Sequence, residues 1–440
     1  MTDPDNSQDN PIASKPNRAA LAMVFVTVFI DLLGFGIVLP VLPRYGEAFK
    51  ASGMTLGLLM ASFSAMQFVF APLWGRISDR IGRRPVLLVG LAGSTFFYGL
   101  FGVATALGPE GKLLGMGVLS WLFITRIGAG IAGATISTAQ AYIADITGRK
   151  DRAKGMALIG AAFGIGFVFG PLIGAACLHD ADPTRPPALP GYIASAMSGI
   201  ALLWAIFLLP ESLKSRDAQQ AAATHGLVHL ARFLNAFRLP VIGVTLISSF
   251  FTILAFAQFE STLSLLTDHL ELSLFQNSLV YTYIGVILTI VQAGVVRRIA
   301  PKVGEFRMAI TGVSILMIGL ILIGLTGQTQ SVTQLILVIP LAVIGFAFAN
   351  PAFYSLLSLN TPADEQGEML GVGQSVSALA RIAGPVIGLS LKGPAGQWSS
   401  MPYWVAAGVM CLAWLMTLTL RNAHITQAVG SAPAGEAPGH

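Results

Sequence analysis

The chain has 440 residues, of which 54% are hydrophobic and only 11% carry a charge, with a formal net charge of +5. Soluble globular proteins carry about 25% charged residues, and no soluble fold of this length has an interior that could hide so much apolar surface. An integral membrane protein is therefore the class that fits. The two cysteines, Cys177 and Cys411, lie far apart in apolar segments, which excludes a disulfide framework or a cysteine metal site.

Apolar segments long enough to cross a bilayer follow one another along the chain. A spanning helix needs about 20 predominantly apolar residues. With that requirement the sequence predicts twelve spans, at residues 20–43, 54–75, 85–106, 117–143, 155–177, 190–209, 240–264, 275–296, 308–326, 332–358, 369–391 and 402–420. The predicted fold class is all-α integral membrane, with two six-helix bundles and both termini on one side.

The basic residues indicate which side that is. With the termini inside, nineteen of the 26 Lys and Arg residues fall in inner segments. The outer loops hold five: Arg44, Lys50, Lys112, Arg185 and Lys392. Basic residues favour the cytoplasmic side, so we expect a multi-pass protein of the cytoplasmic membrane with both termini cytoplasmic. Charge spread over many short loops also argues against a nucleic-acid partner.

The two halves of the chain repeat each other. The basic turn GRISDRIGRRP at residues 75–85 returns in altered form as RIAPKVGE at residues 298–305, and Gly170-Pro171 is matched by Gly384-Pro385. We expect a disordered tail (1–19), an N-terminal bundle (20–210), a cytoplasmic linker with an amphipathic helix (211–239), a C-terminal bundle (240–420) and a second disordered tail (421–440). Parallel six-span repeats with a site between them are typical of transporters.

Four charged residues lie inside predicted spans, namely Asp31, Arg126, Glu260 and Arg381. Each costs at least about 2.5 kcal/mol to insert, and ionisable groups at such depth are functional by default. We expect Asp31 to approach Arg126 in the first half and Glu260 to approach Arg381 in the second. Static ion pairs or snorkelling side chains are the alternative. A carboxyl group held between desolvation and a nearby cation can load and release a proton. Asp31 and Glu260, with Arg126, are therefore the proton-coupling candidates.

Neutral polar side chains inside the spans extend this set. The substrate-binding candidates are Gln67, Arg126, Gln258, Glu260, Gln292, Asn350, Gln374 and Arg381. No pattern for a metal, a cofactor or a catalytic group is visible, so we expect none of these and no enzyme.

Glycines are frequent in the fifth predicted span, at Gly166, Gly170 and Gly174, with Pro171 beside them. Small residues let membrane helices approach closely, so this face is expected to pack tightly and to act as a hinge or sliding surface. The GxGxxG sequence at residues 128–133 lacks the preceding strand of a dinucleotide site and is interpreted as helix packing.

With these motifs the chain resembles the major facilitator superfamily. Residues 75–84 resemble its signature loop between the second and third helices, residues 126–130 its fourth-helix motif, and residues 166–174 its antiporter-type fifth helix. The resemblance implies a gating role for the signature loop. Its residues here are Gly75, Asp79, Arg80, Gly82, Arg83 and Arg84.

Within this superfamily the first half resembles the tetracycline-efflux proteins, through DLLGFG at 31–36, PVLP at 40–43, MQFVFAP at 66–72 and YIAD at 142–145. The resemblance implies proton-driven export, with Asp31, Asp79 and Arg126 in coupling or gating. A His and an Asp of those exporters correspond here to Leu288 and to Ile310 or Thr311. The second half is similar to animal tetracycline transporter-like proteins of organic anions, through FESTLS at 259–264, RRI at 297–299 and ALAR at 378–381.

The sequence thus predicts a monomeric proton-coupled antiporter that exports small amphipathic or drug-like organic compounds across a lipid bilayer by alternating access. One alternative is an organic-anion transporter whose specificity rests on Arg126 and Arg381. Another is a membrane scaffold that transports nothing, for which the buried charges would be dispensable.

Overall fold

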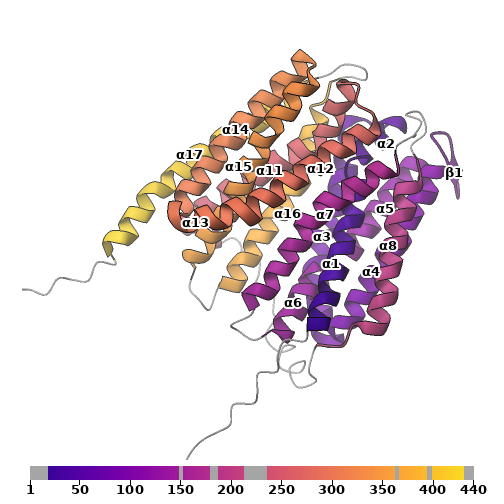
Figure 1. Cartoon of the computed structure of the whole chain (residues 1–440), viewed down its shortest axis with the longest axis horizontal. Helices are drawn as coiled ribbons and strands as arrows, with labels where there is room; N and C mark the ends of the chain where they lie inside the picture. Colours follow the sequence, from indigo (N-terminus) through magenta and orange to yellow (C-terminus); the bar gives the residue numbers. More distant parts are fainter. Residues whose placement is uncertain are drawn as a thin grey trace, which may run out of the picture.

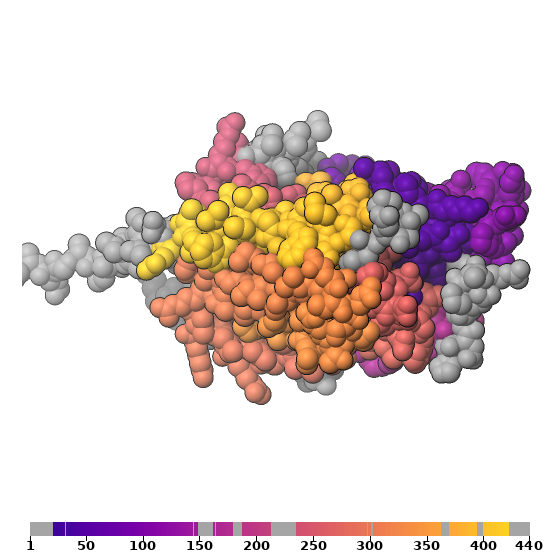
Figure 2. All heavy atoms as spheres, turned by 90° about the horizontal axis from the view of Figure 1, so that it is seen from above, coloured from indigo at the N-terminus to yellow at the C-terminus, as the bar shows by residue number. Residues whose placement is uncertain are grey.

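The computed structural model describes residues 18–147, 152–178, 187–212, 235–361, 366–393 and 399–430. In these ranges the chain is helical apart from short connections and one hairpin, which pairs Lys112–Leu113 (β1) with Met116–Gly117 (β2). Figure 1 shows the helices in two groups that lie side by side, one from each half of the chain. Figure 2 shows the same division from above, with the later helices in orange and yellow beside the earlier ones in indigo and purple.

The N-terminal half contains α1 (Arg18–Val38), α2 (Leu42–Ala48), α3 (Gly53–Ile81), α4 (Arg83–Ala106), α5 (Val118–Gly133), α6 (Ile136–Ile146), α7 (Arg152–Ala176) and α8 (Leu189–Leu208). The C-terminal half contains α11 (Pro240–His269), α12 (Leu274–Ile290), the π-helix η1 (Val291–Val296), α13 (Arg297–Val303), α14 (Glu305–Thr329), α15 (Val332–Leu359), α16 (Gln366–Ser390) and α17 (Met401–Gly430).

Every predicted span corresponds to a helix. Eleven helical segments of the described chain are long and apolar enough to cross a membrane. The twelfth prediction, 155–177, falls on α7, whose apolar segment at Gly164–Ala176 is shorter than a full span within the described residues. The all-α membrane fold is therefore confirmed.

Most predicted boundaries differ from the structure by a few residues; α1, for example, ends at Val38 and α3 extends to Ile81. The span at 275–296 continues through η1 and α13 to Val303. Helix α17 runs to Gly430, so the first part of the tail predicted as disordered from residue 421 is helical. No proline interrupts the segment before Pro433, and glycine is a common helix terminator. The N-terminal tail up to residue 17 and most of the predicted linker helix lie outside the described residues.

The fourth predicted span, 117–143, is broken into two helices. Helix α5 ends at Gly133 and α6 begins at Ile136, while the ψ angles of Ala134 and Thr135 lie at 2° and 0°. Glycine weakens a helix by about 1 kcal/mol relative to alanine, and the glycine-rich sequence before the break lowers the cost of leaving the helical conformation. The break frees backbone carbonyls that need donors from elsewhere, because lipid offers none.

The repeated turn has the same backbone geometry in both halves. Gly82, before α4, has φ 105° and ψ 157°, and Gly304, before α14, has φ 81° and ψ 156°. These left-handed values favour glycine, which has no Cβ to clash. The correspondence between the two sequences thus extends to local conformation.

The Gly-Pro helices pack against equivalent neighbours in the two halves. On α7, a Cβ at Gly170 would stand 2.7 Å from Cα of Gly36 on α1. On α16, a Cβ at Gly384 would stand 2.8 Å from the carbonyl oxygen of Leu254 on α11. Both approaches are too close for a side chain, so small residues serve tight packing at these two positions.

The most extensive helix contacts between the halves are those of α3 with α16 and of α7 with α12 (Figure 1), and α2 also contacts α11. A Cβ at Gly57 on α3 would stand 2.7 Å from Cα of Val386 on α16. Where α7 meets α12, the hydroxyl of Thr289 donates to the carbonyl of Gly164 at 3.3 Å. Because α3 and α12 are second in their halves and α7 and α16 fifth, the two contacts are related by the internal repeat.

Candidate functional site

The guanidinium group of Arg126 lies between two aromatic rings inside the N-terminal half. Arg126 is 2% exposed, and its Cζ lies 4.4 Å from the ring centre of Phe63 and 5.6 Å from that of Phe35. Its Nε and Nη1 atoms have no hydrogen-bond partner among the described groups. Cation–π contacts contribute about 0.5–2 kcal/mol each, less than full hydrogen bonding would provide, so the two unpartnered nitrogens leave this buried cation able to bind an anion or an acceptor.

The aromatic cluster around Arg126 reaches the C-terminal half. Phe35 on α1 stacks on Phe63 of α3 with 4.9 Å between ring centres, and meets Phe167 of α7 edge-on at 6.4 Å. The backbone of Phe167 lies against Gly285 of α12, where a side chain would clash. Two aromatic residues, Phe35 and Phe167, thus lie between Arg126 and the interface between the halves.

The predicted partner of Arg126, Asp31, is on α1 one helical turn before Phe35. The side chain of Asp31 lies outside the described part of the structure, so the Asp31–Arg126 pair stays a prediction. Its position on the helix is compatible with that pair, because residues four apart share a helix face.

The side chain of Gln67, predicted to bind substrate, instead makes a hydrogen bond to the protein backbone. Its Nε2 donates to the carbonyl of Gly133 at 3.2 Å, and Trp74 Nε1 donates to the carbonyl of Ile131 at 2.8 Å. Both acceptors lie at the break between α5 and α6. Gln67 thus provides a donor to the Gly133 carbonyl, and Trp74 adds a second donor to the Ile131 carbonyl, which also accepts the Ala134 N–H. This favours a structural role for Gln67.

In the C-terminal half, Arg381 of α16 lies close enough to Glu260 of α11 and Tyr354 of α15 to act on both electrostatically. No ion pair within 4.0 Å joins Glu260 to Arg381. Tyr354 is also held by Ser377, with 2.8 Å between the hydroxyl oxygens. The predicted pair is thus close in space but not closed into a salt bridge, which leaves both charges able to interact with a third group.

The remaining polar candidates fall into two groups. Gln374 and Arg381 are both exposed on α16 and share a face because they are seven residues apart. Asn350 on α15 is half-buried, and its Oδ1 has no hydrogen-bond partner among the described residues. These three side chains remain available to a ligand.

The other two candidates are less available. Gln258 is fully buried, and its Nε2 donates to the carbonyl of Pro402 on α17 at 2.6 Å, a placement that favours helix packing. Gln292 is half-buried within η1. A single π-helical turn inside a long helix is frequent at functional sites, and no sequence pattern had indicated it.

The signature loop is held by an ionic network around the buried side chain of Arg83, within the N-terminal half. Arg83 Nη1 lies 2.5 Å from Oδ1 of Asp79, and its Nε lies 3.1 Å from Oδ2 of Asp145 on α6. Arg83 Nη1 also donates to Ser78 Oγ at 2.7 Å. Asp79 and Arg83 are thus brought together, while Arg80 is exposed. The gating role of the loop stays a prediction.

Glu211, which follows α8, is a member of this network that sequence reasoning missed. Its carboxylate accepts the backbone N–H of Arg83 at 2.9 Å and that of Arg84 at 3.1 Å. A carboxylate at a helix N-terminus satisfies free N–H groups and is favoured by the helix dipole. The available signal was the acid itself, the first polar residue after the sixth span.

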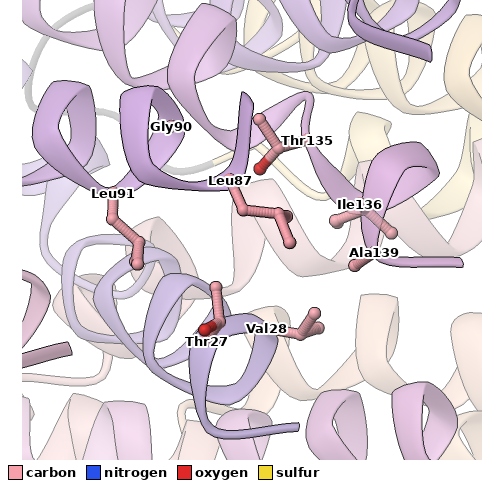
Figure 3. A pocket seen from close by; sticks show the side chains of 8 residues that line it. All are labelled: Thr27, Val28, Leu87, Gly90, Leu91, Thr135, Ile136 and Ala139. Carbon is pink, nitrogen blue, oxygen red and sulfur yellow. The ribbon is translucent and has the colours of Figure 1, made fainter. Parts of the chain in front are cut away.

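Two hollows lie away from these groups. Figure 3 shows a cavity of about 10 Å³ inside the N-terminal half, lined mainly by apolar side chains with the hydroxyls of Thr27 and Thr135. It has room for about one water molecule, not for an organic substrate. A larger groove of about 490 Å³ lies among α11, α12 and α15, with Glu271, Gln276 and Tyr283 in its lining. Neither hollow contains a predicted site residue.

Known sequences that are similar to this chain belong to membrane transporters. The sequence model of the Major Facilitator Superfamily matches residues 24–385. The chain is 30% identical over 409 residues to the class C tetracycline resistance protein of Escherichia coli, covering 91% of this chain and 96% of that protein. It is 28% identical over 377 residues to multidrug resistance protein 2 of Bacillus subtilis, covering 84% and 88%.

Solved structures share the same arrangement of helices. The human organic anion transporter MFSD10 (TETRAN) superposes with a TM-score of 0.64 at 25% sequence identity, over 92% of this chain and all of that one. A D-xylose–proton symporter superposes with a TM-score of 0.74 at 17% identity, over 92% and 97% of the two chains. The second likeness concerns the fold alone.

Proposed function

The chain belongs to the major facilitator superfamily, and from this premise we propose that it exports small amphipathic organic compounds in exchange for protons. The observation that carries the proposal is the state of the charges inside the predicted spans. Arg126 lies between two aromatic rings, with two nitrogens that have no partner among the described residues, and Glu260 and Arg381 are close without a salt bridge. Purely structural charges at such depth are expected to pair fully.

The chemistry of these groups suits a coupled cycle. The stacked rings of Phe35 and Phe63 surround the guanidinium of Arg126 with apolar groups, and the nitrogens of Arg126 without a described partner offer donors to the polar groups of a solute. Asp31 and Glu260 are the proton carriers. A proton on either carboxyl group makes that half of the protein more positive by one charge. This change in charge alters the affinity for the solute, so binding of the proton can oppose binding of the solute.

The signature-loop end of the molecule is assigned to the cytoplasm, together with both termini, because the basic residues gather there. Between described residues, the hydrogen bonds and ion pairs that join the two halves lie at the opposite end or near mid-membrane. We therefore interpret the structure as inward-facing. Similarity to bacterial efflux proteins favours the inner membrane of a bacterium.

A reconstituted system tests this proposal. Purified protein in liposomes that contain a pH-sensitive dye is mixed with a panel of cationic, neutral and anionic amphipathic compounds. Antiport predicts that at least one compound drives proton movement in the opposite direction, and that Glu260→Gln abolishes it. If no compound moves protons while the same compounds still cross the membrane with the protein present, coupling is wrong.

Transport of organic anions is the second candidate. It is favoured by the exposed Arg381 on the same face of α16 as Gln374 and by the similarity to a transporter of such compounds. Competition between anionic and cationic compounds separates the two candidates. Arg381→Gln should weaken anion binding about tenfold or more if the guanidinium binds the anion directly, and should leave cation binding unchanged.

A further inference from the structure

Two of the five basic residues predicted for the outer loops lie between the halves. Arg44 extends from α2 towards α11, and Lys392, after α16, pairs with Glu47 of α2. Cations on this side run against the charge bias of the chain, so their presence calls for a structural reason. Both contacts bridge the N- and C-terminal halves at the end opposite the signature loop.

The guanidinium group of Arg44 makes its hydrogen bonds to the C-terminal half. Nε donates to the carbonyl of Ser264 at 3.2 Å, Nη1 to the carbonyl of Leu272 at 2.8 Å, and Nη2 to Oγ1 of Thr267 at 3.0 Å. The nearest acid, Asp268, lies 3.4 Å from Nη1, but its side chain is 57% exposed, against 10% for that of Arg44. Solvent screens such a pair, so the three neutral acceptors define the contact.

The end of α1 makes a second set of bonds beside Arg44. Helix α1 ends at Val38, and the carbonyl of Pro40 is left without a helical donor. It accepts Ser264 Oγ and Asn277 Nδ2, both at 2.8 Å, and Thr267 Oγ1 donates to Asn277 Oδ1 at 2.6 Å. Pro40 and Arg44 of one half thus enter a single buried hydrogen-bond network with the other half.

At two glycines of α3 next to this network, the neighbouring helix α16 leaves no space for a larger side chain. At Gly53, on the first turn of α3, a Cβ would clash with the carbonyl oxygen of Leu389 on α16, and Gly57 one turn later meets Val386. The polar network therefore lies beside two tightly packed helices, and the path between the halves is closed at this end.

We propose that Arg44 is the gate residue of this end, and that its bonds to Ser264, Thr267 and Leu272 must break before the path can open there. The proposal rests on the alternating-access cycle of the proposed function. Burial lowers the pKa of Arg44, while Asp268, Tyr281 and Glu47 raise it. Arginine nevertheless stays charged at neutral pH, so the gate opens by separation of the halves and not by loss of a proton.

Distances between spin labels test this assignment without knowledge of the substrate. The full-length protein, without its two natural cysteines, carries labels at Met54 and Met401, which are exposed at the gate end. A second sample carries them at Ile81 and Leu359, which are exposed at the signature-loop end. Pulsed electron paramagnetic resonance of each sample then gives the populations closed and open at that end.

Arg44→Ala should shift the closed-to-open ratio about tenfold or more, since it removes three hydrogen bonds between the halves. The distance at the gate end should lengthen and that at the signature-loop end should shorten. Arg44→Lys should give a smaller shift, because an ammonium group cannot reproduce the planar fork. Lys112→Ala, which removes a cation from the exposed hairpin, should leave both distributions unchanged.

Wild-type distance distributions in folded Arg44→Ala protein would overturn the assignment. If Arg44→Ala does not fold, Arg44→Lys decides, and unchanged distances in that variant overturn it equally. Failure of the proposed function is distinguishable, since it would appear as an absence of proton-coupled transport in the wild-type protein, whatever the distances do.

Discussion

The carboxylate of Glu211 occupies the space into which a side chain at Gly82 would project. Gly82 also has a left-handed φ of 105°, so two independent constraints act on one glycine. Glu211 is at the beginning of the segment that connects the two halves, and the contact holds this segment against the first turn of α4. The signature loop is thus a joint between α3, α4 and the segment after α8.

Alanine substitutions at Gly82 and Gly304 separate these two constraints. Each should lose about 1–2 kcal/mol from the left-handed conformation. Gly82→Ala should lose about 1–3 kcal/mol more, because Glu211 is displaced from two N–H groups. No described atom lies within 4 Å of a Cβ at Gly304, so Gly304→Ala is the matched control. Thermal unfolding in detergent measures the difference, and equal melting temperatures for the two variants would contradict this explanation.

Phe63→Leu tests whether the ring face holds Arg126 in place. It keeps an apolar side chain but removes the face 4.4 Å from the guanidinium, which should cost about 1–2 kcal/mol of stability and reduce transport at least several-fold. Phe63→Tyr should retain both. Phe96→Leu, at a ring that is 63% exposed, is the control. Transport as strong in Phe63→Leu as in Phe96→Leu would show that the ring serves packing alone.

Gln67→Leu distinguishes a structural role from a substrate contact. It leaves the Gly133 carbonyl without its donor, which should cost about 1–3 kcal/mol of stability. The apparent KM for transported compounds should stay within about twofold of the wild-type value, since the side chain is turned to the helix break. A large rise in KM with an unchanged melting temperature would instead return Gln67 to the substrate site.

Much of the fold followed from the sequence because lipid imposes simple rules. Span length and small residues in the Gly-Pro helices were sufficient to predict the helices and their close contacts. The break after Gly133, the π-helix at Gln292 and the extension of α17 were not predictable, because a hydropathy pattern records how apolar a segment is and not how its backbone is bonded. Glycine-rich sequence alone did not distinguish packing from a break.

The candidate site was predictable in part. Charged residues inside apolar segments stood out, and the structure places Glu260 near Arg381 as expected. Glu211, Arg44 and Asn277 were not found, because they lie at span ends, where polar residues are ordinary. Their importance comes from partners more than a hundred residues away in the sequence, and such pairings are set by tertiary packing.

The central claim is that a carboxyl group at mid-membrane couples solute movement to a proton. Asp31→Asn in proteoliposomes tests it most directly, with transport driven by a pH gradient compared with counterflow of the same solute at equal pH. The claim predicts that gradient-driven transport is abolished while counterflow persists, because exchange of solute alone needs no net proton movement. Gradient-driven proton uptake at the wild-type rate in Asp31→Asn would contradict the coupling role of Asp31.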